Sequence, residues 1–201
     1  MKLRITTNDI QSIPFDETHS PYFQEMNDEW FFKNPGLEHY RLLSYLSKQF
    51  SNATLLDIGT SRGSSALALS YNKSNTIHTF DIEKCILNPK LQSLSNVHYH
   101  YDNLFNDTTF LSYKQLILSS PLLFLDISPH NGHMELEFYK ALKFIGYSGL
   151  LVCDDIHHFE GMRKFWFEIP IEEKFDLTRY GHWSGTGLIS FNKDLQIELG
   201  N

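Results

Sequence analysis

Carboxylate side chains follow the apolar segments of this sequence at regular intervals. Most of the strand-like segments end on an aspartate or next to one, and these aspartates are Asp57, Asp81, Asp102, Asp126 and the pair Asp154 and Asp155. A single aspartate in such a place is a common turn or helix-capping residue. A repeated pattern indicates acids brought together at one rim of a parallel sheet, where α/β proteins bind their ligands.

Three of these carboxylates, Asp126, Asp154 and Asp155, are predicted to hold one cation. Converging carboxylates repel each other unless a cation or protons neutralise them. Oxygen ligands with room for water suit Mg²⁺, or alternatively Mn²⁺ or Ca²⁺. An ion bound to a substrate hydroxyl would lower the pKa of that hydroxyl and orient its oxygen. The alternative is that Asp154 contacts the ligand while Asp155 caps the following turn.

A histidine beside these acids is the first candidate for a general base. His130 follows Asp126 by four residues in a loop expected at the same rim, and imidazole exchanges protons near neutral pH. His157 and His158, which follow the aspartate pair, are alternatives as base or metal ligand. Further along the chain, His182 and Trp183 could face the substrate mouth, although an ordinary turn with a packed tryptophan is the favoured interpretation.

A glycine-containing turn follows the first apolar strand. Gly59 and Gly63, with Thr60 and Ser61 between them, allow a tight turn and let a ligand approach the backbone ahead of a helix. Ser61 stands where a dinucleotide fingerprint has its second glycine, and no Lys-Ser/Thr pair follows, so neither that fingerprint nor a P-loop is present. Asp81 ends the next strand about 20 residues further on, a spacing that suits hydrogen bonds from two ribose hydroxyls.

The positions of these residues require a sheet. Apolar runs predict strands at 54–59, 76–81, 97–101, 121–126 and 149–154, and helical periodicity appears in 39–50, 64–71, 134–144 and 159–167. Two closing strands, 175–180 and 187–191, have only a short connection and are expected to pair antiparallel at one edge. The sequence therefore predicts an α/β fold with a doubly wound, mostly parallel seven-stranded sheet and an antiparallel edge.

The run Leu55-Leu56-Asp57-Ile58-Gly59-Thr60-Ser61-Arg62-Gly63, with Asp81 ending the next strand, resembles motif I and the ribose-binding acid of class I S-adenosylmethionine-dependent methyltransferases. The resemblance covers roughly residues 37–191. It implies that 57–63 line the methionine part of the cofactor, that Asp81 holds the ribose and that Asp102 reaches the adenine amine.

The segments 123–126 and 150–156 resemble the metal-dependent small-molecule O-methyltransferases. In those enzymes an acid after the fourth strand and an Asp-Asp or Asp-Asn pair after the fifth bind a divalent ion. The loop at 128–133 departs from the related Asp-x-Asp-His-Ser-Tyr stretch, because it lacks the second acid and the lysine that the catechol enzymes use as base.

These features predict methyl transfer from S-adenosylmethionine to a hydroxyl of a small molecule of sugar or natural-product type, with a divalent ion or His130 supplying the deprotonated oxygen. Two alternatives stay open. A nicotinamide-dependent Rossmann oxidoreductase would need a phosphate-cradling loop and usually a Tyr/Lys pair, neither of which can be placed. A nucleoside-binding module would keep the pocket without the chemistry.

Composition limits the partners. Acidic residues outnumber basic ones by 24 to 17 among 201 residues, which disfavours nucleic acid. The apolar runs fall far short of the ~20 residues of a membrane span, and no signal peptide is recognised. Two cysteines, Cys85 and Cys153, are too few for a disulfide framework, so we expect a reduced, cytoplasmic enzyme. Homo-oligomerisation is left open.

The chain length corresponds to one main domain. We expect a methyltransferase-like catalytic domain at 37–201, preceded by an N-terminal cap or arm at 1–36 that is rich in aromatic and turn-forming residues. This arm is expected to contain a short helix around 22–33 and to close over the substrate.

Overall fold

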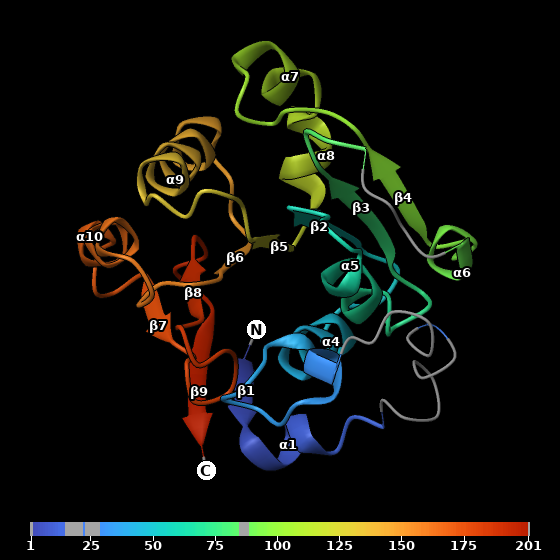
Figure 1. Cartoon of the computed structure of the whole chain (residues 1–201). Coiled ribbons are helices and arrows are strands. Elements are labelled where there is room, and N and C mark those ends of the chain that lie inside the picture. Colours follow the sequence, from blue (N-terminus) through green and yellow to red (C-terminus); the bar gives the residue numbers. More distant parts are fainter. Residues whose placement is uncertain (1, 15–21, 23–28, 85–88, 201) are drawn as a thin grey trace.

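The computed structural model describes residues 2–14, 22, 29–84 and 89–200, and its centre is a seven-stranded sheet in the order β4-β3-β2-β5-β6-β8-β7 (Figure 1). The strands are β2 (Thr54–Ile58), β3 (Thr76–Phe80), β4 (Val97–His100), β5 (Leu122–Leu125), β6 (Leu150–Cys153), β7 (Lys174–Asp176) and β8 (Gly187–Ser190). Strands β2 to β6 are parallel, and β8 pairs antiparallel with both β6 and β7. The predicted doubly wound sheet with an antiparallel edge is confirmed.

Helices cover both faces of this sheet. Helices α4 (Tyr40–Lys48) and α5 (Ser64–Leu69) share one buried cluster with Leu55 and Phe124. Helices α8 (Lys114–Ser119), α9 (His133–Ile145) and α10 (Glu160–Glu168) share the cluster on the opposite face with Leu56 and Leu123 (Figure 1). Adjacent strand residues such as Leu55 and Leu56 serve opposite clusters because side chains alternate along a strand. Two short helices, α6 (Pro89–Gln92) and α7 (Asp107–Ser112), complete the connections around β4.

The last predicted strand pair differs in length from the sequence expectation. Strand β7 ends at Asp176 rather than at residue 180, because the next residues form a turn in which the N–H groups of Tyr180 and Gly181 donate to the carbonyl of Leu177. Cys153 is a free, buried cysteine in β6, whereas Cys85 lies outside the described residues.

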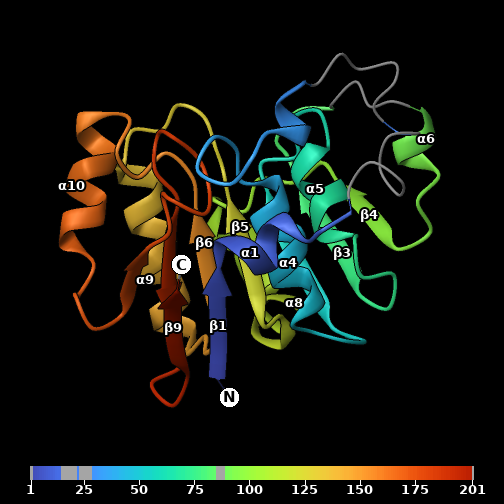
Figure 2. The same cartoon turned by 90° about the horizontal axis from the view of Figure 1, so that it is seen from below.

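The two ends of the described chain form a second, two-stranded sheet. Strand β1 (Lys2–Thr6) pairs in parallel with β9 (Gln196–Gly200), and Figure 2 shows the two side by side. Helix α1 (Thr7–Gln11) follows, and its Ile10 is buried in the cluster that contains α4. The sequence analysis did not anticipate this pairing. Within the described ranges, no helix combines the length and apolar character needed to cross a bilayer.

The proposed N-terminal arm is described only in part. Most of the helix expected around 22–33 lies outside the described residues; its last part is the 3-10 helix η1 (Glu29–Phe32). Phe31 of η1 is fully buried and stacks on Tyr40 with the ring centroids 5.0 Å apart. This part of the segment therefore packs on α4, and the division of the chain after residue 36 stays a prediction.

Three histidines stack across the outer strands β3 and β4. His78 Nδ1 lies 2.8 Å from His100 Nε2, and the ring of His78 stacks on that of His98 with the centroids 4.9 Å apart. Burial, with the neighbouring His100 and His98, lowers the pKa of His78 to about 4. The unfolded chain, with a histidine pKa near 6.5, then binds protons that the folded chain does not. The free energy of unfolding should therefore fall as the pH falls from about 6.5 to 4.

A His78→Gln variant should show a shallower acid-induced loss of stability. The measurement is urea unfolding at a series of pH values between 4 and 7, and the matched control is His133→Gln, since His133 is exposed at the start of α9. A decline as steep in His78→Gln as in the native chain would contradict the assignment of the proton uptake to His78.

Candidate functional site

The turn after β2 is held against the neighbouring strand. The N–H groups of Gly59 and Thr60 donate to the carbonyl of Phe80 at 2.9 and 3.1 Å. Gly59 has a φ of 105°, and a Cβ atom there would lie 1.7 Å from the carbonyl oxygen of Asp126, so this position requires glycine. Ser61 adopts a left-handed φ of 45° in the place where the dinucleotide fingerprint has glycine.

Asp81 is joined to this turn. The Ser61 N–H donates to Asp81 Oδ2 at 2.9 Å, and the Glu83 N–H donates to Asp81 Oδ1 at 3.1 Å. Each carboxylate oxygen keeps a second lone pair for a ligand hydroxyl. The turn and Asp81 line a cavity of about 730 Å³, called here the larger cavity, whose wall continues to Asp102 and Ile127. Its position at the carboxyl ends of parallel strands is where open α/β sheets bind ligands.

Asp102 has a hydrogen-bonded position in the wall of the larger cavity. The hydroxyl of Tyr113 donates to Asp102 Oδ2 at 2.6 Å. This hydrogen bond to a carboxylate, together with burial, raises the pKa of Tyr113 to about 12. The contact leaves Asp102 Oδ1 for a donor in the cavity, such as the exocyclic amine that the family resemblance assigns to it.

Two of the predicted cofactor residues, Asp57 and Gly63, line neither cavity described here, and Asp57 lies beneath the turn. It is fully buried and accepts a hydrogen bond of 2.6 Å from the Thr79 hydroxyl, which lies 2.6 Å from the hydroxyl of Thr60. Burial raises the pKa of Asp57 to about 7. These contacts support the turn from below, and they place Asp57 behind the binding surface.

A smaller cavity of about 410 Å³ adjoins the larger one. Both are lined by Gly59, Ser61, Arg62 and Asp126, so these residues form a common wall. The smaller cavity is bounded elsewhere by a buried acid, a histidine and aromatic rings, which are Glu38, His182, Trp30, Tyr40 and Trp183. His182 and Trp183 line the smaller cavity, and Trp183 is exposed, so the favoured interpretation of a packed tryptophan in an ordinary turn is not seen.

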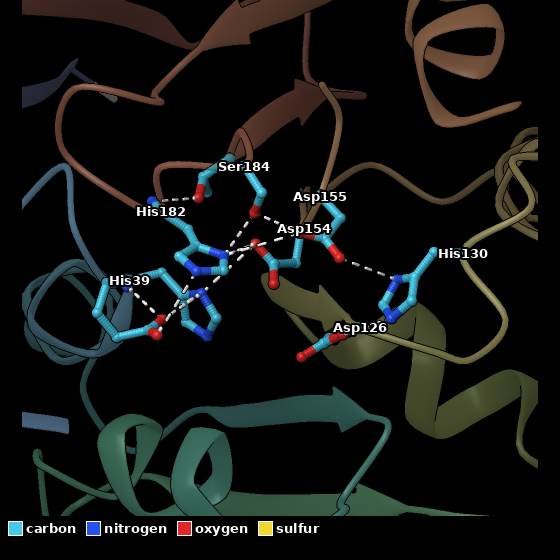
Figure 3. Close-up of polar contacts among 9 residues, drawn as sticks. His39, Asp126, His130, Asp154, Asp155, His182 and Ser184 are labelled. Carbon is cyan, nitrogen blue, oxygen red and sulfur yellow. Dashed lines mark hydrogen bonds and ion pairs between the residues drawn. The ribbon is translucent and has the colours of Figure 1, made fainter. Parts of the chain in front are cut away.

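Asp154, at the end of β6, meets two histidines from distant segments (Figure 3). Its Oδ1 lies 3.5 Å from Nδ1 of His39, the residue that precedes α4, and 3.3 Å from Nδ1 of His182. Burial disfavours the ionised form of Asp154, but the nearby positive charges of His39 and His182 outweigh it, and the pKa of Asp154 lies below its ordinary value. The other acid of this cluster behaves oppositely, since burial and the charge of Asp154 raise the pKa of Asp126 to about 8.

Asp155 lies in the same cluster but has different partners from Asp154. The Ser184 hydroxyl donates to its Oδ1, and His130 Nδ1 lies 3.5 Å from its Oδ2 (Figure 3). His130 Nε2 in turn lies 3.9 Å from Asp126 Oδ1. The structure therefore brings the predicted base His130 between two of the three predicted metal-binding acids, Asp126 and Asp155.

The two alternative histidines are not brought to this cluster. His157 Nε2 lies 2.7 Å from Asp176 Oδ2, and both side chains are exposed. The ring of His158 packs against Phe159 and Trp183, with centroid distances of 4.1 and 5.4 Å. Neither His157 nor His158 is among the described residues whose ligand atoms gather closely enough for a common ion.

The donor groups at the rim fit a divalent cation. Ligand atoms of His39, Asp126 and Asp154 lie within 4.8 Å of one another. His39 and Asp154 are only 3% and 5% exposed, and among the described residues neither His39 ring nitrogen nor Asp154 Oδ1 has a hydrogen-bond partner of good geometry. Buried polar atoms without partners are unfavourable, and an ion would satisfy them.

The sequence analysis missed Glu38 and His39. Glu38 is 5% exposed, and its Oε1 accepts the His39 N–H at 2.8 Å and lies 2.9 Å from His39 Nδ1. The only available signal was a pair of adjacent titratable residues before a helix, which is common at the surface of proteins.

No family model matches this sequence, and no curated protein matches it. Solved structures do match this chain. The S-adenosylhomocysteine (SAH)-bound methyltransferase PaMTH1 of Podospora anserina is similar with a TM-score of 0.52 and 17% identity over 75% of this chain and 76% of that one. Cofactor-bound Rv0187 from MTB has a TM-score of 0.50 and 15% identity over 77% and 80% of the two chains. The chain thus has the Rossmann-like fold of the S-adenosylmethionine-dependent methyltransferases.

Proposed function

We propose that this protein transfers the methyl group of S-adenosylmethionine to a hydroxyl of a small molecule, of sugar or natural-product type, with the assistance of a divalent ion. The observation that carries the proposal is the contact of the Ser61 N–H with Asp81 at the wall of the larger cavity. This arrangement offers carboxylate oxygens to a ribose beside a turn that a ligand can approach closely.

In this proposal the larger cavity binds the cofactor and the smaller cavity binds the acceptor. Asp81 accepts the ribose hydroxyls, and Asp102 faces the adenine amine in the larger cavity. The turn from Gly59 to Gly63 borders the passage to the smaller cavity, where the acceptor is held next to Asp126. S-adenosylmethionine supplies an already activated methyl group, so the main task of the chain is to hold the acceptor oxygen in line with it.

Two groups are available to deprotonate the acceptor hydroxyl. A divalent ion, when bound by the acids of the rim, lowers the pKa of a coordinated hydroxyl. His130, which faces Asp126 and Asp155 and is partly exposed, can accept the proton at the rim. The aromatic rings of Trp30, Tyr40 and Trp183 in the smaller cavity suit a ring-bearing acceptor, because such rings pack face to face or on edge.

Calorimetric titration of the purified chain with SAH and NAD⁺ tests the proposal. We expect SAH to bind with a dissociation constant on the order of 10 μM, or about −7 kcal/mol, and NAD⁺ to give no heat of binding. Absence of SAH binding at 1 mM would refute the proposal, and binding of NAD⁺ alone would favour an oxidoreductase. Binding of SAH without methyl transfer to any of a panel of sugars and phenols would favour the nucleoside-binding module.

A further inference from the structure

We propose that the rim of the sheet is a binding site for a first-row transition-metal ion, of the class of Mn²⁺, Fe²⁺ or Zn²⁺, held by His39, Asp126 and Asp154. This inference deepens the proposed function and rests on its use of a divalent ion. It departs from the three-carboxylate Mg²⁺ site expected from the sequence, because an imidazole replaces the carboxylate of Asp155.

His39 is held rigidly toward the cluster. Its ring packs against Phe124 and Tyr40 with centroid distances of 5.0 and 4.6 Å, so its orientation is set by the core of the protein. The side chain is buried, and among the described residues neither ring nitrogen completes a hydrogen bond. A buried imidazole whose ring nitrogens lack well-oriented hydrogen-bond partners is unfavourable, and a cation held between it and the neighbouring acids would satisfy it.

The two carboxylates, Asp126 and Asp154, are also placed to bind an ion. Asp154 Oδ1 also lacks a hydrogen-bond partner among the described residues, and Asp126 lies at the common wall of both cavities. The ligand atoms of His39, Asp126 and Asp154 lie within 4.8 Å of one another. Opposite ligand atoms around one ion are about 4.4 Å apart when each bond is about 2.2 Å long. The three ligand atoms are therefore close to the spacing that one ion can span.

Asp155 is less available than His39. It already accepts the hydroxyl of Ser184 and faces His130 and His182, with nitrogen-to-oxygen distances of 3.5 and 3.8 Å. His39 Nδ1 lies 2.9 Å from Glu38 Oε1. A carboxylate next to the imidazole can orient a metal-binding histidine and increase its basicity.

The donor types set the ion preference. Mg²⁺ is bound through oxygen and usually keeps several waters, whereas imidazole is a good ligand for Mn²⁺, Fe²⁺ and Zn²⁺. One nitrogen and two carboxylates therefore favour a transition-metal ion over Mg²⁺ at this site.

The test uses the full-length chain without a histidine tag, freed of metal with a chelator and titrated with MnCl₂. Binding is followed by the loss of the free Mn²⁺ signal in electron paramagnetic resonance and by calorimetry. We expect one Mn²⁺ per chain and less than half displacement by a tenfold excess of MgCl₂. His39→Ala should weaken Mn²⁺ binding by about 100-fold, while the exposed-histidine control His133→Ala should bind as the native chain does.

A second variant addresses selectivity. His39→Asp creates an all-carboxylate set and should lower the preference for Mn²⁺ over Mg²⁺ by at least tenfold. If His39→Ala fails to fold by circular dichroism, Asp126→Asn serves instead, because Asp126 is only partly buried and should also lose Mn²⁺ binding. Native-like Mn²⁺ affinity in folded His39→Ala, or no Mn²⁺ binding by the native chain, would overturn the inference. Neither outcome affects the SAH titration, so the two proposals fail independently.

Discussion

An Asp81→Ala variant is expected to bind SAH about 100-fold more weakly than the native chain. The carboxylate supplies acceptors for two ribose hydroxyls, and hydrogen bonds to a charged group contribute about 1.5–3 kcal/mol each. It also fixes the turn through the Ser61 N–H, whose 2.9 Å hydrogen bond would be lost. Since 1.4 kcal/mol corresponds to a tenfold change in affinity, a loss of about 2.7 kcal/mol is a moderate estimate. Calorimetry gives the dissociation constants directly.

The control for this variant is Asp194→Ala, which removes the same charge from an exposed position outside the residues that line either cavity. It should bind SAH with native affinity. Comparable melting temperatures of the two variants would show that loss of folding does not explain the difference. An SAH affinity within twofold of native in a folded Asp81→Ala variant would mean that the ribose is not held at Asp81.

The arrangement of the larger cavity could be predicted because its determinants are local. Strands such as β5 and β6 are buried on both faces and so appear as short apolar runs, each closed by an acid. Parallel pairing of β2 with β3 then places Gly59 and Asp81 at neighbouring strand ends. The contact of the Ser61 N–H with Asp81 follows from this topology without knowledge of any distant side chain.

The metal-binding part of the site could not be predicted in the same way. The burial of His39 depends on Phe124 and Asp154, which lie on strands far along the chain. Asp155 adopts a left-handed φ of 59° and contacts Ser184, a partner on the segment that leads into β8. Neither contact leaves a periodic signal in the sequence. The role of Asp155 as a metal ligand stays a prediction.

The pairing of β1 with β9 was missed for a related reason. Strand β9 is mostly exposed and carries Gln196 and Glu198, so it lacks the apolar run that marks a core strand. Its partner β1 begins at Lys2, at the opposite end of the chain. A strand of this kind is defined by its neighbour rather than by its own composition.

Gly59→Ala should destabilise the chain by about 3 kcal/mol or more and abolish SAH binding. The methyl group would occupy the space of the Asp126 carbonyl oxygen, 1.7 Å away, and the φ of 105° is unfavourable for any residue with a Cβ atom. Backbone strain and overpacking each cost about 1–3 kcal/mol. Relief requires separating the turn from the end of β5, which would disrupt both cavities at their common wall. Urea unfolding measures the first effect and calorimetry the second.

Gly146→Ala separates crowding from backbone conformation. Gly146 ends α9 with a φ of 76°, but no atom lies within 4 Å of the position its Cβ would take. This variant should lose only the roughly 1 kcal/mol that a left-handed conformation costs and should keep native SAH affinity. Equal losses of stability in the two variants would show that the approach of the turn to Asp126 is unimportant. A larger loss at Gly59 would show that glycine is required there because the backbone of Asp126, directly after β5, passes against the turn that follows β2.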